Sequence, residues 1–147
     1  MKKQILNIVA TISFLFVVSA VSAYAQAPEM KANIPFDFQI NGKVMKAGEY
    51  TIFEPVSPKG LVIIRGGEKV SAAASLVYTV DSEKVADQTQ LVFRRYGDQY
   101  FLSQMTVKGM AHNRELPTTK AERELKNTRH LAGNKSEPQI VTVAIAQ

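Results

Sequence analysis

Apolar and polar residues alternate along most of the chain after its first 25 residues. In the segment 34–40, isoleucine or phenylalanine occupies every second position, and Pro35, Asp37 and Gln39 lie between them. A period of two is typical of a strand with one buried face. Proline has no amide donor, so Pro35 favours a strand start or a sheet edge. The segment 34–40 is therefore predicted to be a half-buried strand.

A two-residue turn signal, Asn41-Gly42, directly follows this strand. That pair is preferred in hairpins because both central residues take positive φ. Counting outward from the turn sets Phe38 opposite Met45 and Asp37 opposite Lys46. An apolar pair on one face and an opposite-charge pair on the other favour this register.

A second turn signal, Gly66-Gly67, separates the apolar run 61–65 from a long stretch that ends at residue 80. A two-residue turn at this point predicts Arg65 opposite Glu68 and Ile63 opposite Val70.

A third signal, Gly97-Asp98, predicts a hairpin in which Phe93 faces Leu102 and Arg94 faces Phe101. In that register the Arg94 guanidinium can lie over the Phe101 ring. Strands with turn signals at this spacing indicate an all-β domain. We expect a small antiparallel β-sandwich, with a small barrel as the second choice.

One segment departs from the strand pattern. Thr119 and Glu122 have the spacing of a capping box, in which each side chain satisfies a free amide at a helix start. Glu122 and Lys126 are spaced for an ion pair, and Gly133 is a natural helix end. The sequence thus predicts a polar loop and a short helix at about 111–133. A last strand at 140–145 is expected to pair back into the sheet.

The first 25 residues have the features of a secretory signal peptide. Lys2 and Lys3 precede a mostly apolar stretch at 5–18, and Ala23-Tyr24-Ala25 is a small-residue cleavage site. That stretch is shorter than the roughly 20 residues of a spanning helix, and no second apolar run is long enough to span a bilayer. We expect export to the periplasm or the exterior, and residues 26–147 form a single predicted domain.

Composition excludes several kinds of chemistry. The 147 residues contain no cysteine, so a thiol nucleophile, a thiolate metal site and a disulfide framework are excluded. Two histidines, His112 and His130, are too few for a typical zinc site unless carboxylates such as Glu115 join them. No catalytic, cofactor-binding or metal-binding residue is singled out.

Charge is distributed unevenly along the chain, which favours an anionic partner. The formal charge is +5, yet residues 94–135 alone contain nine Lys and Arg and four Asp and Glu. Basic side chains near aromatic ones can bind an anionic envelope polymer or a lipid head group, whereas export argues against nucleic acid. The candidate surface for such a partner consists of Arg94, Arg95, Lys108, Arg114, Lys120, Arg123, Lys126 and Arg129.

Three stretches resemble a group of small exported all-β proteins of environmental Gram-negative bacteria. They are Ile34-Pro-Phe-Asp-Phe with Asn41-Gly42, then Ala47-Gly-Glu-Tyr-Thr51, and the block 91–104 followed by Arg114-Glu-Leu-Pro117. The resemblance implies export and a β fold and implies no reaction. Residues 47–52 alone also resemble the turn-to-strand motif of transthyretin-like β-sandwich modules.

The leading functional hypothesis is an exported non-enzymatic domain that binds or supports a component of the cell envelope. An alternative is a small glycan-acting hydrolase that uses two of the carboxylates Asp37, Glu49, Glu54 and Asp98. A third is a carrier that holds an apolar ligand inside a barrel. A filled core with a basic outer face would favour the first hypothesis, and a dry central cavity would favour the third.

Overall fold

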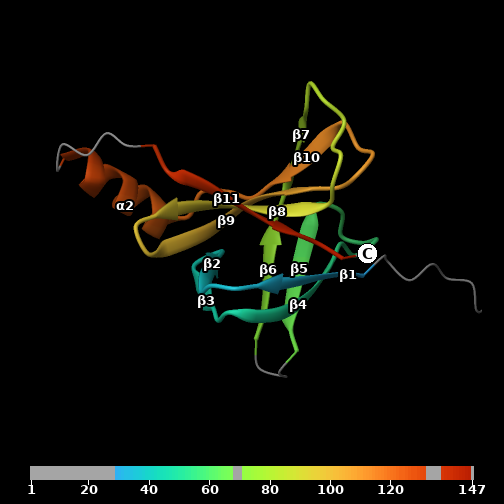
Figure 1. Cartoon of the computed structure of the whole chain (residues 1–147), viewed down its shortest axis with the longest axis horizontal. Coiled ribbons are helices and arrows are strands. Elements are labelled where there is room, and N and C mark those ends of the chain that lie inside the picture. The colour runs from blue at the N-terminus through green and yellow to red at the C-terminus, as the bar shows by residue number, and fades with distance from the viewer. Residues whose placement is uncertain (1–28, 68–70, 132–136, 147) are drawn as a thin grey trace, which may run out of the picture.

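The strands form two sheets, as seen in the computed structural model, which describes residues 29–67, 71–131 and 137–146 (Figure 1). The smaller sheet has the order β1 (Met30–Ile34), β4 (Gly48–Phe53), β5 (Leu61–Gly66) and β6 (Ala72–Leu76). The larger has the order β11 (Gln139–Ala144), β8 (Gln90–Tyr96), β9 (Gln99–Thr106), β10 (His112–Glu115) and β7 (Tyr78–Asp81). A small hairpin, β2 (Phe38–Ile40) and β3 (Lys43–Met45), joins the larger sheet where β2 pairs with β9.

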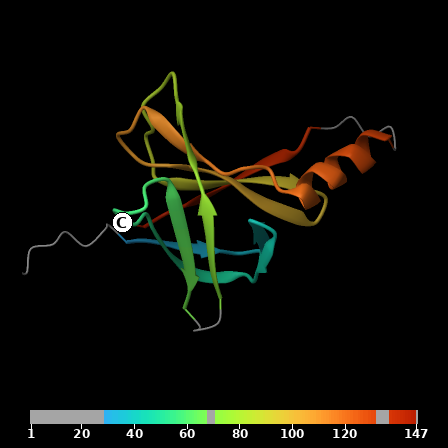
Figure 2. The same ribbon diagram turned by 180° about the vertical axis from the view of Figure 1, so that it is seen from behind.

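The predicted all-β class is confirmed. The pairings are antiparallel except the contact of β2 with β9, and helix α2 (Lys120–Leu131) precedes the last strand, β11. The second choice, a barrel, is wrong, because the described strands do not close on themselves. Figure 2 shows the same two sheets from behind, with α2 at one end of the molecule.

The core lies between the two sheets and is filled by side chains from both. Phe38 of β2 and Phe93 of β8 are fully buried, with ring centroids 5.5 Å apart in an edge-to-face arrangement. Phe36 meets Phe93 in the same manner at 5.1 Å. The single strand predicted at 34–40 is wrong, because Ile34 ends β1 of the smaller sheet, residues 35–37 lie in no strand, and β2 begins at Phe38 against the larger sheet. The alternation itself continues upstream in β1, since Met30 and Ala32 are buried along with Ile34.

The Asn41-Gly42 hairpin has the predicted register. Phe38 pairs with Met45, and both turn residues have positive φ. On the outer face, Lys46 Nζ lies 2.7 Å from an oxygen of Asp37.

Replacing Lys46 with glutamine is expected to raise the pKa of the Asp37 carboxyl toward its ordinary value. Hydrogen bonds from Lys46 and from the amide of Ala47 hold that pKa below its usual range. The small stabilisation from the lowered pKa exists above the ordinary pKa and is lost as the pH falls through the lowered one. Carboxyl carbon NMR shifts followed through an acid titration measure the change. The control is Lys43→Gln, because Lys43 Nζ binds the carbonyl of Ala72 instead. An equal shift in the control would contradict the assignment to Lys46.

The Gly66-Gly67 hairpin differs from its prediction. Ile63 pairs with Ala74 and Arg65 with Ala72, so the two-residue turn is wrong and the connection is longer. Glu68 and Val70 lie outside the described residues. The predicted and observed registers turn the same alternate positions inward, so periodicity could not distinguish them. The observed register places Ala73, rather than a lysine, beside the fully buried Ile64.

The Gly97-Asp98 hairpin has the predicted pairs, Phe93 with Leu102 and Arg94 with Phe101. Farther from the turn the register shifts between Val92 and Phe93, because Ser103 is an extra residue on β9. The buried Ser103 hydroxyl donates to the carbonyl of Val92, which satisfies the polar group at this bulge.

Three further predictions need correction. Residues 112–115, expected in a polar loop, form strand β10 between β9 and β7. The capping box is half formed: the amide of Glu122 donates to Thr119 Oγ1 over 3.2 Å, but the Glu122 carboxylate points to β8 instead of back to Thr119. The predicted ion pair of Glu122 with Lys126 is also wrong, because Glu122 pairs with Arg94 of β8, and the ion pair along the helix joins Lys120 to Glu124.

The two ends of the described chain meet beside β1. Lys31 and Ala146 exchange both backbone hydrogen bonds, at 3.0 and 2.8 Å, in an isolated antiparallel bridge. The predicted signal peptide, residues 1–25, and the predicted helix end at Gly133 lie outside the described residues. In the described ranges no helix is long and apolar enough to span a bilayer.

Candidate functional site

The eight basic residues predicted as one surface fall into separate places. Arg94 and Arg114 are only partly exposed, and each forms an ion pair with a glutamate. Lys108 belongs to the connection between β9 and β10, and that connection lies at the end of the molecule away from α2 (Figures 1 and 2). The remaining five lie on α2 or at the nearby β8–β9 turn: Arg95, Lys120, Arg123, Lys126 and Arg129.

Helix α2 is held to β8 through one buried carboxylate. Glu122 is only 3% exposed, and its Oε1 accepts hydrogen bonds from Arg94 Nη1 at 3.1 Å and from the Tyr96 hydroxyl at 3.2 Å. Arg94 also donates to the hydroxyl of Thr118, just before the helix. Burial, and then the charge of Glu122, raises the pKa of Tyr96 above its usual range. This cluster is an anchor for the helix, and Arg94 is therefore not part of a free basic surface.

The predicted contact of Arg94 with the Phe101 ring is wrong, because the Arg94 guanidinium is bound to the Glu122 carboxylate of the helix instead. The cation–π contact is made by the next residue, Arg95, whose guanidinium lies 5.4 Å from the centre of the Tyr100 ring.

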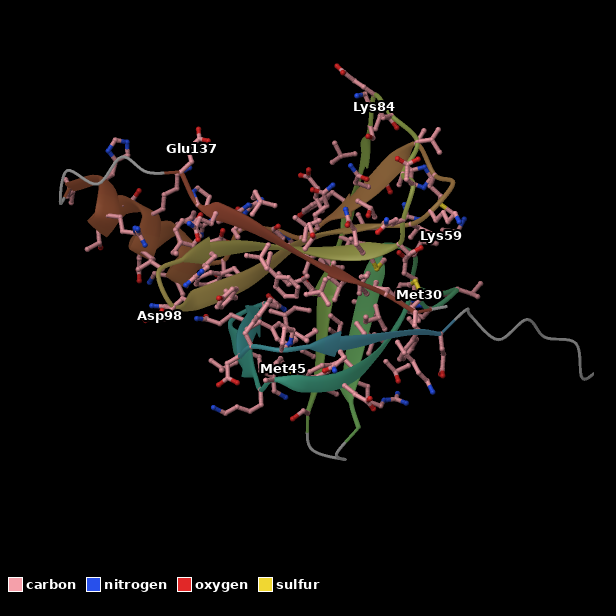
Figure 3. The ribbon with its side chains drawn as sticks, viewed as in Figure 1. Met30, Met45, Lys59, Lys84, Asp98 and Glu137 are labelled. Atoms are coloured by element: carbon pink, nitrogen blue, oxygen red, sulfur yellow. The ribbon has the colours of Figure 1, made fainter. Side chains whose placement is uncertain are left out.

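At the opposite end of the molecule, an open groove of about 770 Å³ lies where edges of the two sheets meet. Figure 3 labels Met30 and Lys59 at this end, far from Asp98 and Glu137 at the α2 end. The small sheet contributes residues at the start of β1 and after β4, and the large sheet contributes residues of β7, β10 and the β9–β10 connection. The apolar part of its lining consists of Met30, Pro55, Val56, Val107 and Met110.

An ion pair forms part of the groove wall. Arg114 Nε of β10 lies 3.0 Å and 3.3 Å from the two carboxylate oxygens of Glu54, which follows β4. The Arg114 and Glu54 side chains are 19% and 30% exposed, so the pair is partly shielded from water and joins the two sheets. Glu29 and Lys59 add one charge of each sign. The groove thus combines apolar walls with balanced charges.

Sequence reasoning missed this groove. The residues that line it come from five segments that are far apart in the sequence. The alternation of apolar and polar residues predicts which face of a strand is buried, but it does not predict which edges of two sheets come together. One signal was available: Val56 and Met110 are apolar residues within turn-rich connections, and Val56 is 73% exposed. Exposed apolar residues in connecting segments often belong to binding sites.

Two of the carboxylates considered for glycan hydrolysis have cationic partners. Asp37 is paired with Lys46 and Glu54 with Arg114. His112 lies on β10 opposite Asp81 of β7. In the part of the chain that the structure describes, no three or more His, Asp or Glu residues are grouped so that they could hold a metal ion.

The geometry therefore offers two features for function, the inter-sheet groove and the arginines near α2. Compared with models of known protein families, with curated proteins and with solved structures, the chain has no significant match.

Proposed function

We propose that the protein is an exported, non-enzymatic binding domain of the cell envelope that holds an amphiphilic small molecule in the groove between its sheets. The sequence features at 1–25 support export. The apolar groove supports ligand binding. This combines two of the hypotheses from sequence, an envelope-binding domain and a carrier of an apolar ligand.

The single observation that carries the proposal is the character of the groove. Small-molecule sites are typically concave, mostly apolar, and between roughly 300 and 1,000 Å³, with a few placed polar groups. The groove has a volume of about 770 Å³, apolar walls, and the Arg114–Glu54 pair among its lining residues. Two of its apolar residues are methionines, whose flexible side chains adapt to ligands of different shape.

The place of the ligand differs from that in the barrel-carrier hypothesis. The space between the sheets is occupied by fully buried side chains such as Phe38, Phe93 and Ile52. A ligand would therefore lie at the open end of the sandwich, with its apolar part against the apolar groove walls and its polar part at the rim. The rim offers the carboxylate of Glu29 and the ammonium of Lys59, so a polar group able to both donate and accept hydrogen bonds fits it best.

The double variant Val56→Asp, Met110→Asp is expected to weaken binding of a neutral apolar probe by about tenfold or more, because it puts two carboxylates against the ligand. The purified protein would be titrated with N-phenyl-1-naphthylamine, whose fluorescence rises in apolar surroundings. Both residues are partly or mostly exposed, so the fold should tolerate the change.

The matched control is Val44→Asp, since Val44 is 58% exposed on β3 and does not line the groove. Wild-type affinity is expected in this control. The proposal fails if the probe does not bind the wild-type protein, or if the control weakens binding as much as the groove variant does.

A further inference from the structure

A second, smaller pocket of about 250 Å³ lies at the α2 end, away from the groove. It is bounded by the β8–β9 turn, by the last turn of α2 and by the segment that leads into β11. Its charged residues are Arg95, Arg129 and Glu137. Figure 3 labels Asp98, in the β8–β9 turn, and Glu137 at this end of the molecule.

Within the described part of the chain, Arg129, which lines this pocket, has an unpaired donor. Its Nε atom is buried and has no hydrogen-bond acceptor among the described residues. Buried donors are nearly always satisfied, and an unsatisfied one costs free energy, more so on a charged group. A bound acceptor would remove that cost.

The Arg129 guanidinium lies close to the β8–β9 turn at Gly97. A Cβ built on this glycine would lie 3.7 Å from Arg129 Nη1, which is an ordinary contact distance. The positive φ of 65° is what favours glycine at this position.

Arg95, which lines the same pocket as Arg129, is held by three contacts. Its Nε donates to the carbonyl of Gly97 at 2.7 Å, its Nη1 lies 3.4 Å from the Gln139 side-chain oxygen, and its guanidinium lies over the Tyr100 ring. A guanidinium held in this way loses little side-chain entropy when it binds an anion. The pocket lining thus carries two guanidinium groups and one carboxylate, that of the exposed Glu137.

We propose that this pocket binds a phosphate group, either as free phosphate or as the terminal phosphomonoester of an envelope lipid. Tetrahedral phosphate has several acceptor oxygens, so it can accept from Arg129 and Arg95 at once. The pocket volume suits one such group rather than a large ligand. This inference does not depend on the groove, because the two sites share no lining residue.

Titration of the purified protein with inorganic phosphate at constant ionic strength tests the proposal, with the Nε–Hε NMR signals of Arg129 and Arg95 as the readout. Saturable shifts of both signals are expected. Arg129→Lys keeps the charge and removes the fork of donors, and it should weaken binding by about tenfold. Glu137→Gln removes a repulsive charge and should strengthen binding several-fold.

The matched control is Arg123→Gln, which removes one positive charge from an exposed position on the same helix. Phosphate affinity close to that of the wild type is expected. Weaker binding in Arg123→Gln together with wild-type affinity in Arg129→Lys would show attraction by net charge alone and would overturn the proposal. A far-ultraviolet circular dichroism spectrum and melting temperature like those of the wild type establish that Arg129→Lys is folded.

A second arm identifies the source of the phosphate group. Vesicles with and without phosphatidic acid would be pelleted with the protein and with Arg129→Lys. Phosphatidic acid-dependent pelleting that Arg129→Lys abolishes supports a lipid source. Shifts with inorganic phosphate but no pelleting support free phosphate. Absence of both would overturn the proposal.

Discussion

Replacing Phe93 with alanine is expected to lower the free energy of unfolding by about 4 kcal/mol, the usual range for a large aromatic side chain removed from a core. Phe93 is 0% exposed and its ring meets the rings of Phe36 and Phe38, so its removal leaves a cavity between the sheets. Small domains have a total stability of about 5–15 kcal/mol, and this chain has no disulfide to restrain its unfolded state. Urea denaturation followed by circular dichroism would measure the loss.

The same experiment on Val44→Ala is the control for Phe93→Ala. Val44 is mostly exposed on β3, and a change of about 0.5 kcal/mol or less is expected. A loss of less than about 1 kcal/mol in Phe93→Ala would mean that the two sheets do not share the tightly packed core described above.

The second large effect is expected at the helix anchor. Glu122→Leu should lower the free energy of unfolding by about 2 kcal/mol, because it leaves Arg94 and the Tyr96 hydroxyl without their shared acceptor. This expected loss is smaller than the loss for a fully buried ion pair, since the Arg94 side chain is partly exposed and keeps Thr118 as a hydrogen-bond partner. Chemical denaturation gives the value.

A double-mutant cycle sharpens this prediction. Arg94→Met alone should also destabilise the protein, whereas the double variant Arg94→Met, Glu122→Leu should cost clearly less than the sum of the two single changes. Glu124→Ala is the control, because Glu124 is exposed and its side chain pairs only loosely with Lys120 over 3.7 Å. Strict additivity in the cycle would contradict the anchor.

The anchor also has an alkaline signature. The raised pKa of Tyr96 means that the folded state favours the neutral phenol. This contribution to stability is fully present below the ordinary tyrosine pKa of about 10 and is lost as the pH rises through the raised value. Glu122→Gln should lower the pKa of Tyr96 toward its ordinary value. Tyrosinate absorbance, with Tyr96→Phe subtracted, would record the change.

Local patterns in the sequence were sufficient where a short turn set the register. Asn41-Gly42 and Gly97-Asp98 each fixed the pairing of the strands beside them, and Thr119 fixed the start of α2. Periodicity failed where a register shift preserved the faces, as at Gly66-Gly67. Periodicity also failed at Ser103, since an extra residue in β9 does not change the alternation of apolar and polar residues in its partner strand, β8.

The sites depend on packing between distant segments, which explains why sequence reasoning found so little of them. Eight basic residues close in sequence were expected to share a surface, yet two became partners of Glu54 and Glu122. The distribution of charge along the sequence does not predict which side chains form ion pairs after folding. It also does not predict which edges of the two sheets come together. Arg95 and Arg129 alone among the eight line the polar pocket at the α2 end.

The bridge between Lys31 and Ala146 protects one edge of the smaller sheet. On the side of β1 that faces away from β4, the backbone of Ala146 pairs with Lys31 through two hydrogen bonds (Figure 1). Unpaired strand edges can pair with strands of other molecules. A variant cut before Ala146 would therefore leave Lys31 unpaired on this side and would make self-association through β1 easier.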